Sequence, residues 1–289
     1  MIRTVKVSLF ICFLYAFPLS GQTQFTTTGL FTFQRSLPIP DTYEIGPGQL
    51  TKDGSAFILG LIDGDLENYV DLHSDLYAYS VLPDAPPMPL TAFNLNNPVD
   101  SLRIFQVSAS QNEEHIVFVV NAYSGWNDNE LAIADKLPNG QYSDMRLLTS
   151  VNTPEVSDAY PWLSADALRL YFTNDFKLMY TERSSLQTDF ATPKAVAFTG
   201  AVNLEIVSVW LTPDENTMFL IAGNQLYKSS RKSTDKPFDL PVLYSNEFKD
   251  FYFISGMSFA PDKKTMYLYY SDETTQYILH YTLKKGKAW

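Results

Sequence analysis

Cysteine is almost absent from this sequence, which has 289 residues and a single cysteine, Cys12. A disulfide framework is therefore excluded, and the fold must be stabilised by its hydrophobic core. Histidine is also scarce: His73, His115 and His280 lie far apart, unlike the closely spaced pair of a zinc hydrolase. A Gly-x-Ser-x-Gly nucleophile motif and a glycine-rich phosphate-binding loop are missing as well. The motifs therefore predict no catalytic residue and no metal ligand.

Basic residues are in the minority. Lys and Arg together number 21 against 32 Asp and Glu, which gives a formal net charge of −11 at pH 7. A chain this acidic lacks the positive surface that binds nucleic acid or an anionic membrane, so we predict no nucleic-acid partner. Cations, metals, neutral glycans and basic protein partners remain compatible with its charge.

Long apolar runs are missing except near the N-terminus. Residues 7–19 are mostly apolar, Arg3 and Lys6 precede them, and Ser20-Gly21-Gln22 follows. This order is typical of a secretory signal peptide, and the run is shorter than the ~20 residues of a membrane-spanning helix. We predict a signal peptide at 1–21 and no transmembrane segment. The mature chain, without Arg3 and Lys6, would have a net charge of −13, and we expect it to be exported to the periplasm or secreted.

A repeated unit organises the mature chain, residues 22–289. Its clearest copy covers residues 158–172, which predict a strand, a tight turn and a second strand rich in aromatic and aliphatic residues. One turn residue marks each copy: Asp53, Asn112, Asp166, Asp214 and Asp262. The intervals between the markers are 59, 54, 48 and 48 residues, which is the length of a propeller blade. Because no window shows a helical period, we expect an all-β fold.

These repeats predict a single domain, a five-bladed β-propeller of four-stranded antiparallel blades. The expected blades cover approximately 44–95, 100–150, 155–199, 204–245 and 250–285. The last blade has only three predicted strands, whereas the predicted strand at 28–36 belongs to no blade. Placing this N-terminal strand on the outer edge of the last blade closes the ring and covers an exposed edge.

Residues 160–166, Tyr-Pro-Trp-Leu-Ser-Ala-Asp, and residues 169–173, Arg-Leu-Tyr-Phe-Thr, resemble the WD-like repeat of TolB-type periplasmic propellers. In that family a Ser/Thr-Pro-Asp-Gly turn joins the two inner strands of a blade. The resemblance extends over all five units and is strongest in the third. This chain departs from the motif because glycine follows the Asp only once, at Gly54. The resemblance implies a propeller fold and an exported location, and it implies no catalytic residue.

Two sets of repeated residues are interpreted as structural. The turn Asp side chains are expected to bond their own backbone, as Asp commonly does in tight turns. Trp162 and Trp210 occupy the same position in consecutive units, and we expect them to be buried between blades. A platform for a ligand is the alternative for the two tryptophans.

A second set of acids lies shortly before the inner strands: Glu44, Asp100, Asp158, Glu205 and Asp250. The starts of the inner strands converge on one mouth of the central channel. A ring of carboxylates there could bind a metal or a cationic ligand, or act as acid and base. In so acidic a chain we favour the simpler interpretation, which is ordinary acids on solvent-exposed loops.

The long loops of units one and two, at 63–74 and 121–129, are expected on this same face. The alternation of Asp63, Asp65 and Glu67 is that of a calcium loop, but the required Gly and closing Glu are missing. Calcium is therefore a minor alternative, and no cofactor is predicted. An exposed aromatic on a long loop is typical of a binding surface. The predicted binding residues are Asp63, Asp65, His73, Trp126 and Asp128 at the rim, with Asp158 and Tyr160 at the channel mouth.

The leading functional hypothesis is an exported binding or scaffolding module for a protein or glycan partner in the cell envelope. The alternative is a glycan-processing enzyme similar to five-bladed glycoside hydrolases, with carboxylates at the channel mouth. In that case Glu44, Asp100, and Asp158 or Glu155 are the candidate catalytic residues. The sequence determines neither the partner nor the oligomeric state.

Overall fold

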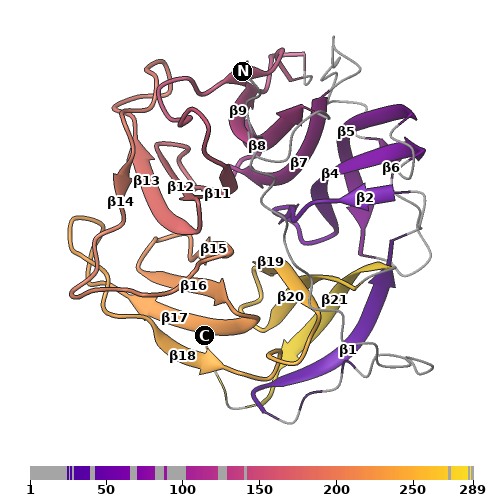
Figure 1. The fold of residues 1–289 in the computed structure, drawn as a ribbon, viewed down its shortest axis with the longest axis vertical. Coiled ribbons are helices and arrows are strands. Elements are labelled where there is room, and N and C mark those ends of the chain that lie inside the picture. Colours follow the sequence, from indigo (N-terminus) through magenta and orange to yellow (C-terminus); the bar gives the residue numbers. More distant parts are fainter. Residues whose placement is uncertain are drawn as a thin grey trace, which may run out of the picture.

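The computed structural model describes residues 25, 27, 29–39, 43–65, 70–81, 88–89, 102–122, 129–139, 142–272, 275–285 and 287. Five antiparallel sheets surround a central axis, and each sheet forms one blade (Figure 1). The predicted all-β, five-bladed propeller is therefore confirmed. The predicted signal peptide lies outside the described residues. Within those residues, no helix is long and apolar enough to cross a membrane.

The strands of each blade follow one another from the axis outward. Blade 1 comprises β2 (Tyr43–Ile45), β3 (Gln49–Leu50), β4 (Ala56–Asp65), β5 (Val70–Ser80) and β6 (Met88–Pro89). Blade 2 comprises β7 (Leu102–Ala109), β8 (His115–Ala122), β9 (Glu130–Asp135) and β10 (Arg146–Leu147). Blade 3 comprises β11 (Asp158–Leu163), β12 (Arg169–Asn174), β13 (Lys177–Glu182) and β14 (Lys194–Ala195).

The last two blades have the same order. Blade 4 comprises β15 (Ser208–Leu211), β16 (Thr217–Ala222), β17 (Gln225–Ser230) and β18 (Val242–Ser245). Blade 5 comprises β19 (Phe253–Phe259), β20 (Thr265–Ser271), β21 (Gln276–Leu283) and, from the other end of the described chain, β1 (Phe31–Pro38). We call the face on which the inner strands begin the mouth face, and the face that carries the marker turns the turn face.

The marker residue fixes the turn between the first two strands of a blade. The backbone N–H of Leu168 donates to Asp166 Oδ1 at 3.0 Å, and the Ser164 hydroxyl donates to the same oxygen at 2.6 Å. The structural interpretation of the turn aspartates is therefore confirmed. The residue after the marker has a positive φ in all five blades: Gly54, Glu113, Ala167, Glu215 and Lys263. Four side-chain-bearing residues thus adopt the left-handed conformation that glycine adopts at lower cost.

The hydrophobic core is divided into layers between adjacent blades. Val117 of blade 2 and Leu170 of blade 3 belong to one buried cluster, and Trp162 of blade 3 and Leu220 of blade 4 belong to the next. Alternation along each strand produces these layers, because each sheet buries both of its faces against neighbours. An interior of this kind is complete only if every blade has two neighbours.

A buried carboxylate adds a polar link between blades 3 and 4. Glu215 is 3% exposed and accepts hydrogen bonds from Arg169 Nε and Nη2 at 2.7–3.0 Å and from the Tyr171 hydroxyl at 3.0 Å. Arg231 Nη2 lies 3.5 Å from the same carboxylate. These partners compensate for the desolvation of Glu215, so the cluster fixes the relative position of the two blades.

The ring is closed where β1 pairs antiparallel with β21, from Phe31 opposite Leu283 to Pro38 opposite Tyr277 (Figure 1). The predicted closure by the N-terminal strand is confirmed. Phe31 has no exposed surface and packs on Phe248 and Tyr281, with ring centroids 5.6 and 6.5 Å away. The Glu247 carboxylate accepts backbone N–H bonds at the start of this strand, including one from Gly29 at 3.1 Å.

Replacing Phe31 by Ala should lower the free energy of unfolding by about 3–5 kcal/mol, because a fully buried ring is lost from the closing strand. Replacing the exposed Thr32 by Ala in the same strand is the matched control and should change stability by less than about 0.5 kcal/mol. Denaturant melts followed by circular dichroism measure both effects. Equal stability of the two variants would show that the closing strand contributes little to the ring.

The closing strand also places two nitrogen-bearing side chains opposite each other. Arg35 of β1 is the register partner of His280 of β21. Arg35 Nε and both ring nitrogens of His280 are buried and have no hydrogen-bond partner among the described residues. The His280 ring stacks on Tyr267 at 4.9 Å. Burial, reinforced by the Arg35 charge and partly opposed by Asp262, lowers the pKa of His280 below its usual value.

Acid should therefore weaken the closure. The unfolded chain takes up the His280 proton first, near pH 6.5, so stability is present above this pH and falls below it. In His280→Phe, which retains a ring against Tyr267, the loss of stability between about pH 7 and pH 5 should be smaller than in the wild type. Melts across this range measure the slope. A slope unchanged by the substitution would mean that His280 does not control the acid response.

Candidate functional site

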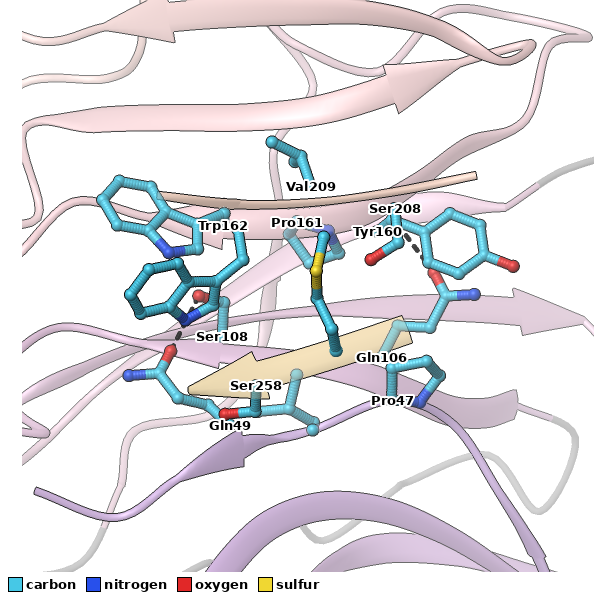
Figure 2. Close-up of a pocket in the computed structure, with 14 residues that line it drawn as sticks. Pro47, Gln49, Gln106, Ser108, Tyr160, Pro161, Trp162, Ser208, Val209 and Ser258 are labelled. Carbon is cyan, nitrogen blue, oxygen red and sulfur yellow. Dashed lines mark hydrogen bonds between the residues drawn. The ribbon is translucent and has the colours of Figure 1, made fainter. Parts of the chain in front are cut away.

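A cavity lies on the propeller axis and takes residues from all five inner strands (Figure 2). Its volume is about 30 Å³, which is room for about two water molecules. The lining residues come from equivalent positions, four to six residues before each turn marker. They are Pro47, Gly48, Gln49, Gln106, Val107, Ser108, Tyr160, Pro161, Trp162, Ser208, Val209, Trp210, Met257 and Ser258. None of these side chains carries a charge.

The lining forms three layers along the axis. Figure 2 places Gln106, Tyr160 and Ser208 at one end of the cavity, which is the end nearer the mouth face. The middle layer is apolar and includes Pro161 and Val209. The end nearer the turn face contains Gln49 and Ser108, together with Trp162. The cavity therefore has two polar ends with an apolar middle layer between them.

Irregularities in the inner strands direct these side chains toward the axis. A bulge interrupts the pairing of β7 between Phe105 and Val107, and another interrupts that of β11 between Ala159 and Trp162. The bulged residues Gln106 and Tyr160 have φ of 51° and 52°. Such left-handed geometry is costly for residues with a side chain, and it is concentrated at functional sites.

Blade 5 has a glycine, Gly256, at the position of Gln106 and Tyr160, because a side chain would not fit there. A Cβ atom on Gly256 would lie 2.5 Å from Cβ of Pro47, the equivalent residue of blade 1. The mouth end of the cavity is thus formed by polar side chains from blades 2, 3 and 4, beside the proline of blade 1. This asymmetry within a ring of similar blades distinguishes one side of the channel.

Gln106 and Tyr160 are held against each other. The backbone N–H of Tyr160 donates to the amide oxygen of Gln106 at 2.7 Å (Figure 2). This bond orients the amide, and the Gln106 side chain is also a hydrogen-bond partner of the Tyr160 side chain. Burial raises the pKa of Tyr160 to about 12, so its hydroxyl remains protonated at neutral pH. The mouth end therefore presents uncharged hydrogen-bonding groups in fixed positions.

The opposite end is bonded from blade to blade. Gln49 of blade 1 accepts from the Ser108 hydroxyl at 2.9 Å and from the Ala109 backbone at 2.8 Å. Ser108 in turn accepts from the Leu163 backbone at 2.9 Å. These bonds tie blades 1, 2 and 3 together, so the polar groups at this end stabilise the ring.

Trp162 and Trp210 were predicted either to be buried between blades or to form a platform for a ligand, and the structure has features of both. Trp162 is 8% exposed and packs edge-on to Tyr171 at 5.8 Å, which confirms its predicted burial between blades. Trp210 is half-buried and lies 4.6 Å from Phe259 of blade 5. Both also line the channel cavity. Their fluorescence therefore reports on the interior of the channel.

Asp158 lies inside blade 3 and is not part of the cavity lining. The equivalent position is isoleucine in the other four blades, at Ile45, Ile104, Ile206 and Ile254. Asp158 is fully buried and accepts from the Thr153 backbone at 2.6 Å and from Asn174 Nδ2 at 2.8 Å. Burial raises its pKa, and these hydrogen bonds partly offset the effect. The contacts give Asp158 a role in holding the segment that leads into β11.

The remaining acids of the predicted ring have different surroundings. Glu44 is half-buried near Arg103, and burial raises its pKa while Arg103 opposes the effect. Glu205 and Asp250 are exposed, as expected for acids on solvent-exposed loops. Asp100 lies outside the described residues. In the part of the chain that the structure describes, no three His, Cys, Asp or Glu side chains are grouped to hold a metal.

The enlarged loop predicted at 63–74 is mostly a hairpin. Strands β4 and β5 extend to Asp65 and from Val70, and they place Asp63 directly opposite His73. The description of Asp63, Asp65 and His73 is limited to their backbone, and Trp126 and Asp128 lie outside the described residues. Their assignment to a binding rim stays a prediction, as does calcium binding.

Of the predicted site residues, the structure places Tyr160 in the cavity lining. Gln106 and Ser208 line the cavity but were not among the predicted site residues; they occupy the same position of their blades as Tyr160, six residues before the marker. The repeat contained this signal, because counting back from each marker would have aligned the three residues. The sequence alone did not show which inner-strand positions face the axis, so this alignment could not be recognised as a site.

No protein-family model matches the chain, and no curated protein matches it in sequence. Among solved structures, glutaminyl cyclase from Myxococcus xanthus has 10% identity and a TM-score of 0.51, and the match covers 88% of this chain and 97% of that one. Puromycin hydrolase has 12% identity and a TM-score of 0.49, with 82% and 35% covered. TolB from Acinetobacter baumannii has 12% identity and a TM-score of 0.42, with 82% and 54% covered.

This chain thus spans about a third of the length of puromycin hydrolase and about half that of TolB. All three similarities fall below the identity at which an activity can be transferred, so they describe architecture alone. The chain has the fold of a five-bladed β-propeller.

Proposed function

We propose that this chain is an exported binding protein that holds an uncharged, hydroxyl-bearing ligand, such as a neutral glycan, at the mouth of its central channel. The observation that carries the proposal is the pair of bulged residues, Gln106 and Tyr160, whose left-handed backbones direct polar side chains to one end of the cavity. A ring closes without such geometry, and its cost is typical of a site selected for binding.

The chemistry of the mouth end supports this ligand class. Gln106 offers an amide, Tyr160 a ring and a hydroxyl, and Ser208 a second hydroxyl. Amides and hydroxyls exchange hydrogen bonds with sugar hydroxyls, and an aromatic ring covers their apolar C–H faces. Because the cavity holds only about two water molecules, one hydroxymethyl-sized group would enter while the sugar ring stays above it.

A glycan-processing enzyme is the less favoured alternative. Glycoside hydrolysis requires two carboxylates flanking the scissile bond. The lining of the cavity contains no carboxylate among the described residues. Asp158 is enclosed by its own hydrogen bonds, and the contribution of Asp100 stays a prediction.

The test is a titration of the mature protein with neutral oligosaccharides, including arabinan and xylan fragments, followed by tryptophan fluorescence. A ligand at the mouth should change the tryptophan emission of the protein, since Trp210 and, at the far end, Trp162 line the same cavity. Tyr160→Phe should weaken binding by about tenfold, the equivalent of one hydrogen bond. Tyr180→Phe, in the same blade but outside the cavity lining, is the matched control and should bind as the wild type does.

The proposal fails if no neutral oligosaccharide changes the fluorescence, or if Tyr160→Phe binds as tightly as Tyr180→Phe. Release of reducing sugar during the titration would instead favour the enzyme.

A further inference from the structure

Three aromatic side chains are exposed on the mouth face over blades 3 to 5. The exposed fractions are 42% for Phe176, 53% for Tyr252 and 39% for Phe253. Phe176 lies between β12 and β13, and the other two residues lie where β19 begins. Large aromatic side chains gain free energy by burial, so several exposed ones on one face are typical of an interaction surface. We call these three residues the aromatic arc.

The backbone beneath the arc is held in place by neighbouring blades. The carbonyl of Phe176 accepts from the Ile206 N–H at 3.0 Å, which joins blade 3 to the start of blade 4. Asn224 of blade 4 donates to the Phe251 carbonyl at 2.6 Å and accepts from the Ile254 N–H at 3.0 Å. Both parts of the arc are thus anchored to blade 4, and a partner would meet a preorganised surface.

The residue before Tyr252 differs from it in exposure. Phe251 lies next to Tyr252 in sequence, and its ring packs on Phe248 and Tyr270 at 5.6 and 5.5 Å. Phe251 therefore supplies the aromatic contact that the blade interface needs. Tyr252 and Phe253 follow it and remain exposed.

The surroundings of the arc are acidic. Exposed carboxylates stand beside each part of it, with Asp175 and Glu205 near Phe176, and Asp250 near Tyr252. The described mouth face also carries Glu44, Glu130, Glu155 and Asp272. Lys177 follows Phe176 directly and Lys249 precedes Asp250; among the described residues these two are the exposed cations of the mouth face, and the carboxylates outnumber them. This local excess has the same sign as the net charge of the whole chain, −11.

We propose that the aromatic arc docks a basic segment of a protein partner, in which Lys or Arg side chains alternate with apolar ones. The apolar groups would cover the exposed rings, and the cations would meet the carboxylates and the ring faces. The acidic charge disfavours a second copy of this chain and an anionic lipid surface. None of the three residues lines the channel cavity, so this inference goes beyond the glycan site and does not require it.

The test uses fluorescence anisotropy with a labelled, acetylated peptide of alternating Lys or Arg and Leu, at low and high salt. A peptide with Glu in place of Lys and Arg is the control probe. The wild type should bind the basic peptide, and salt should weaken that binding. In the triple variant Phe176→Ser, Tyr252→Ser and Phe253→Ser, affinity should fall by at least about tenfold.

A matched control variant removes comparable exposed apolar surface elsewhere. Leu186, Leu240 and Val242 are 40%, 46% and 62% exposed, and they lie after β13 and at β18, away from the arc. Their replacement by Ser should leave the affinity unchanged. Equal binding by the two triple variants, or equal binding of the acidic and basic peptides, would overturn the proposal, as would a failure of the wild type to bind.

The Tyr160→Phe variant separates this inference from the proposed function. Peptide binding that survives Tyr160→Phe supports an independent docking surface, whether or not any oligosaccharide binds. Loss of peptide binding in Tyr160→Phe would assign the peptide to the channel mouth and contradict the inference.

Discussion

The pairing of β1 with β21 is the constraint on which the rest of the molecule depends. Two segments from opposite ends of the described chain form the last blade, and until they meet, blade 5 lacks its outer strand. The apolar clusters lie between blades, so each blade is stable only with a neighbour on both sides. The closing strand contributes Phe31 to one of these clusters and Leu37 to another. Closure therefore completes two interfaces at once.

Closure also creates the site, because the channel exists only when all five inner strands face one axis. The residues at its two ends have different uses. At the end nearer the turn face, Gln49 and Ser108 form hydrogen bonds that join neighbouring blades. At the mouth end, bulges place Gln106 and Tyr160 in the cavity lining, where their side chains are hydrogen-bond partners of each other. The exposed aromatics lie on this same face, so the rigid ring serves as a support for one side.

The fold could be predicted from the sequence because its signals are local and repeated. The marker turns recur at blade-length intervals, and each one specifies a hairpin between two hydrophobic strands. The closing strand could be predicted by counting the strands of each repeat, because the last blade had only three predicted strands and the predicted strand at 28–36 belonged to no blade. These inferences needed no knowledge of how the blades face one another.

The site was less predictable because it depends on the direction of individual side chains. Asp158 precedes an inner strand, as a channel-mouth acid should, yet it occupies a position that other blades fill with isoleucine, and it is buried there. Gln106 escaped notice because a one-residue bulge decides whether it faces the axis or the blade interior. The segment predicted as an enlarged loop in unit one instead extends strands β4 and β5. The alternation of polar and apolar residues does not by itself distinguish such a strand extension from a loop. Bulges and strand extension are set by tertiary packing, so a single sequence signals them weakly.

The central claim is that the mouth face is the binding face, and photo-crosslinking in the producing cell tests it most directly. Benzoylphenylalanine replaces Phe253 on the mouth face in one variant and Lys263 on the turn face in another. Both residues occupy exposed positions, and both variants retain the buried core. The account predicts a discrete crosslinked species from position 253 and none from position 263. A species formed from position 263 alone would place the binding surface on the turn face and contradict the account.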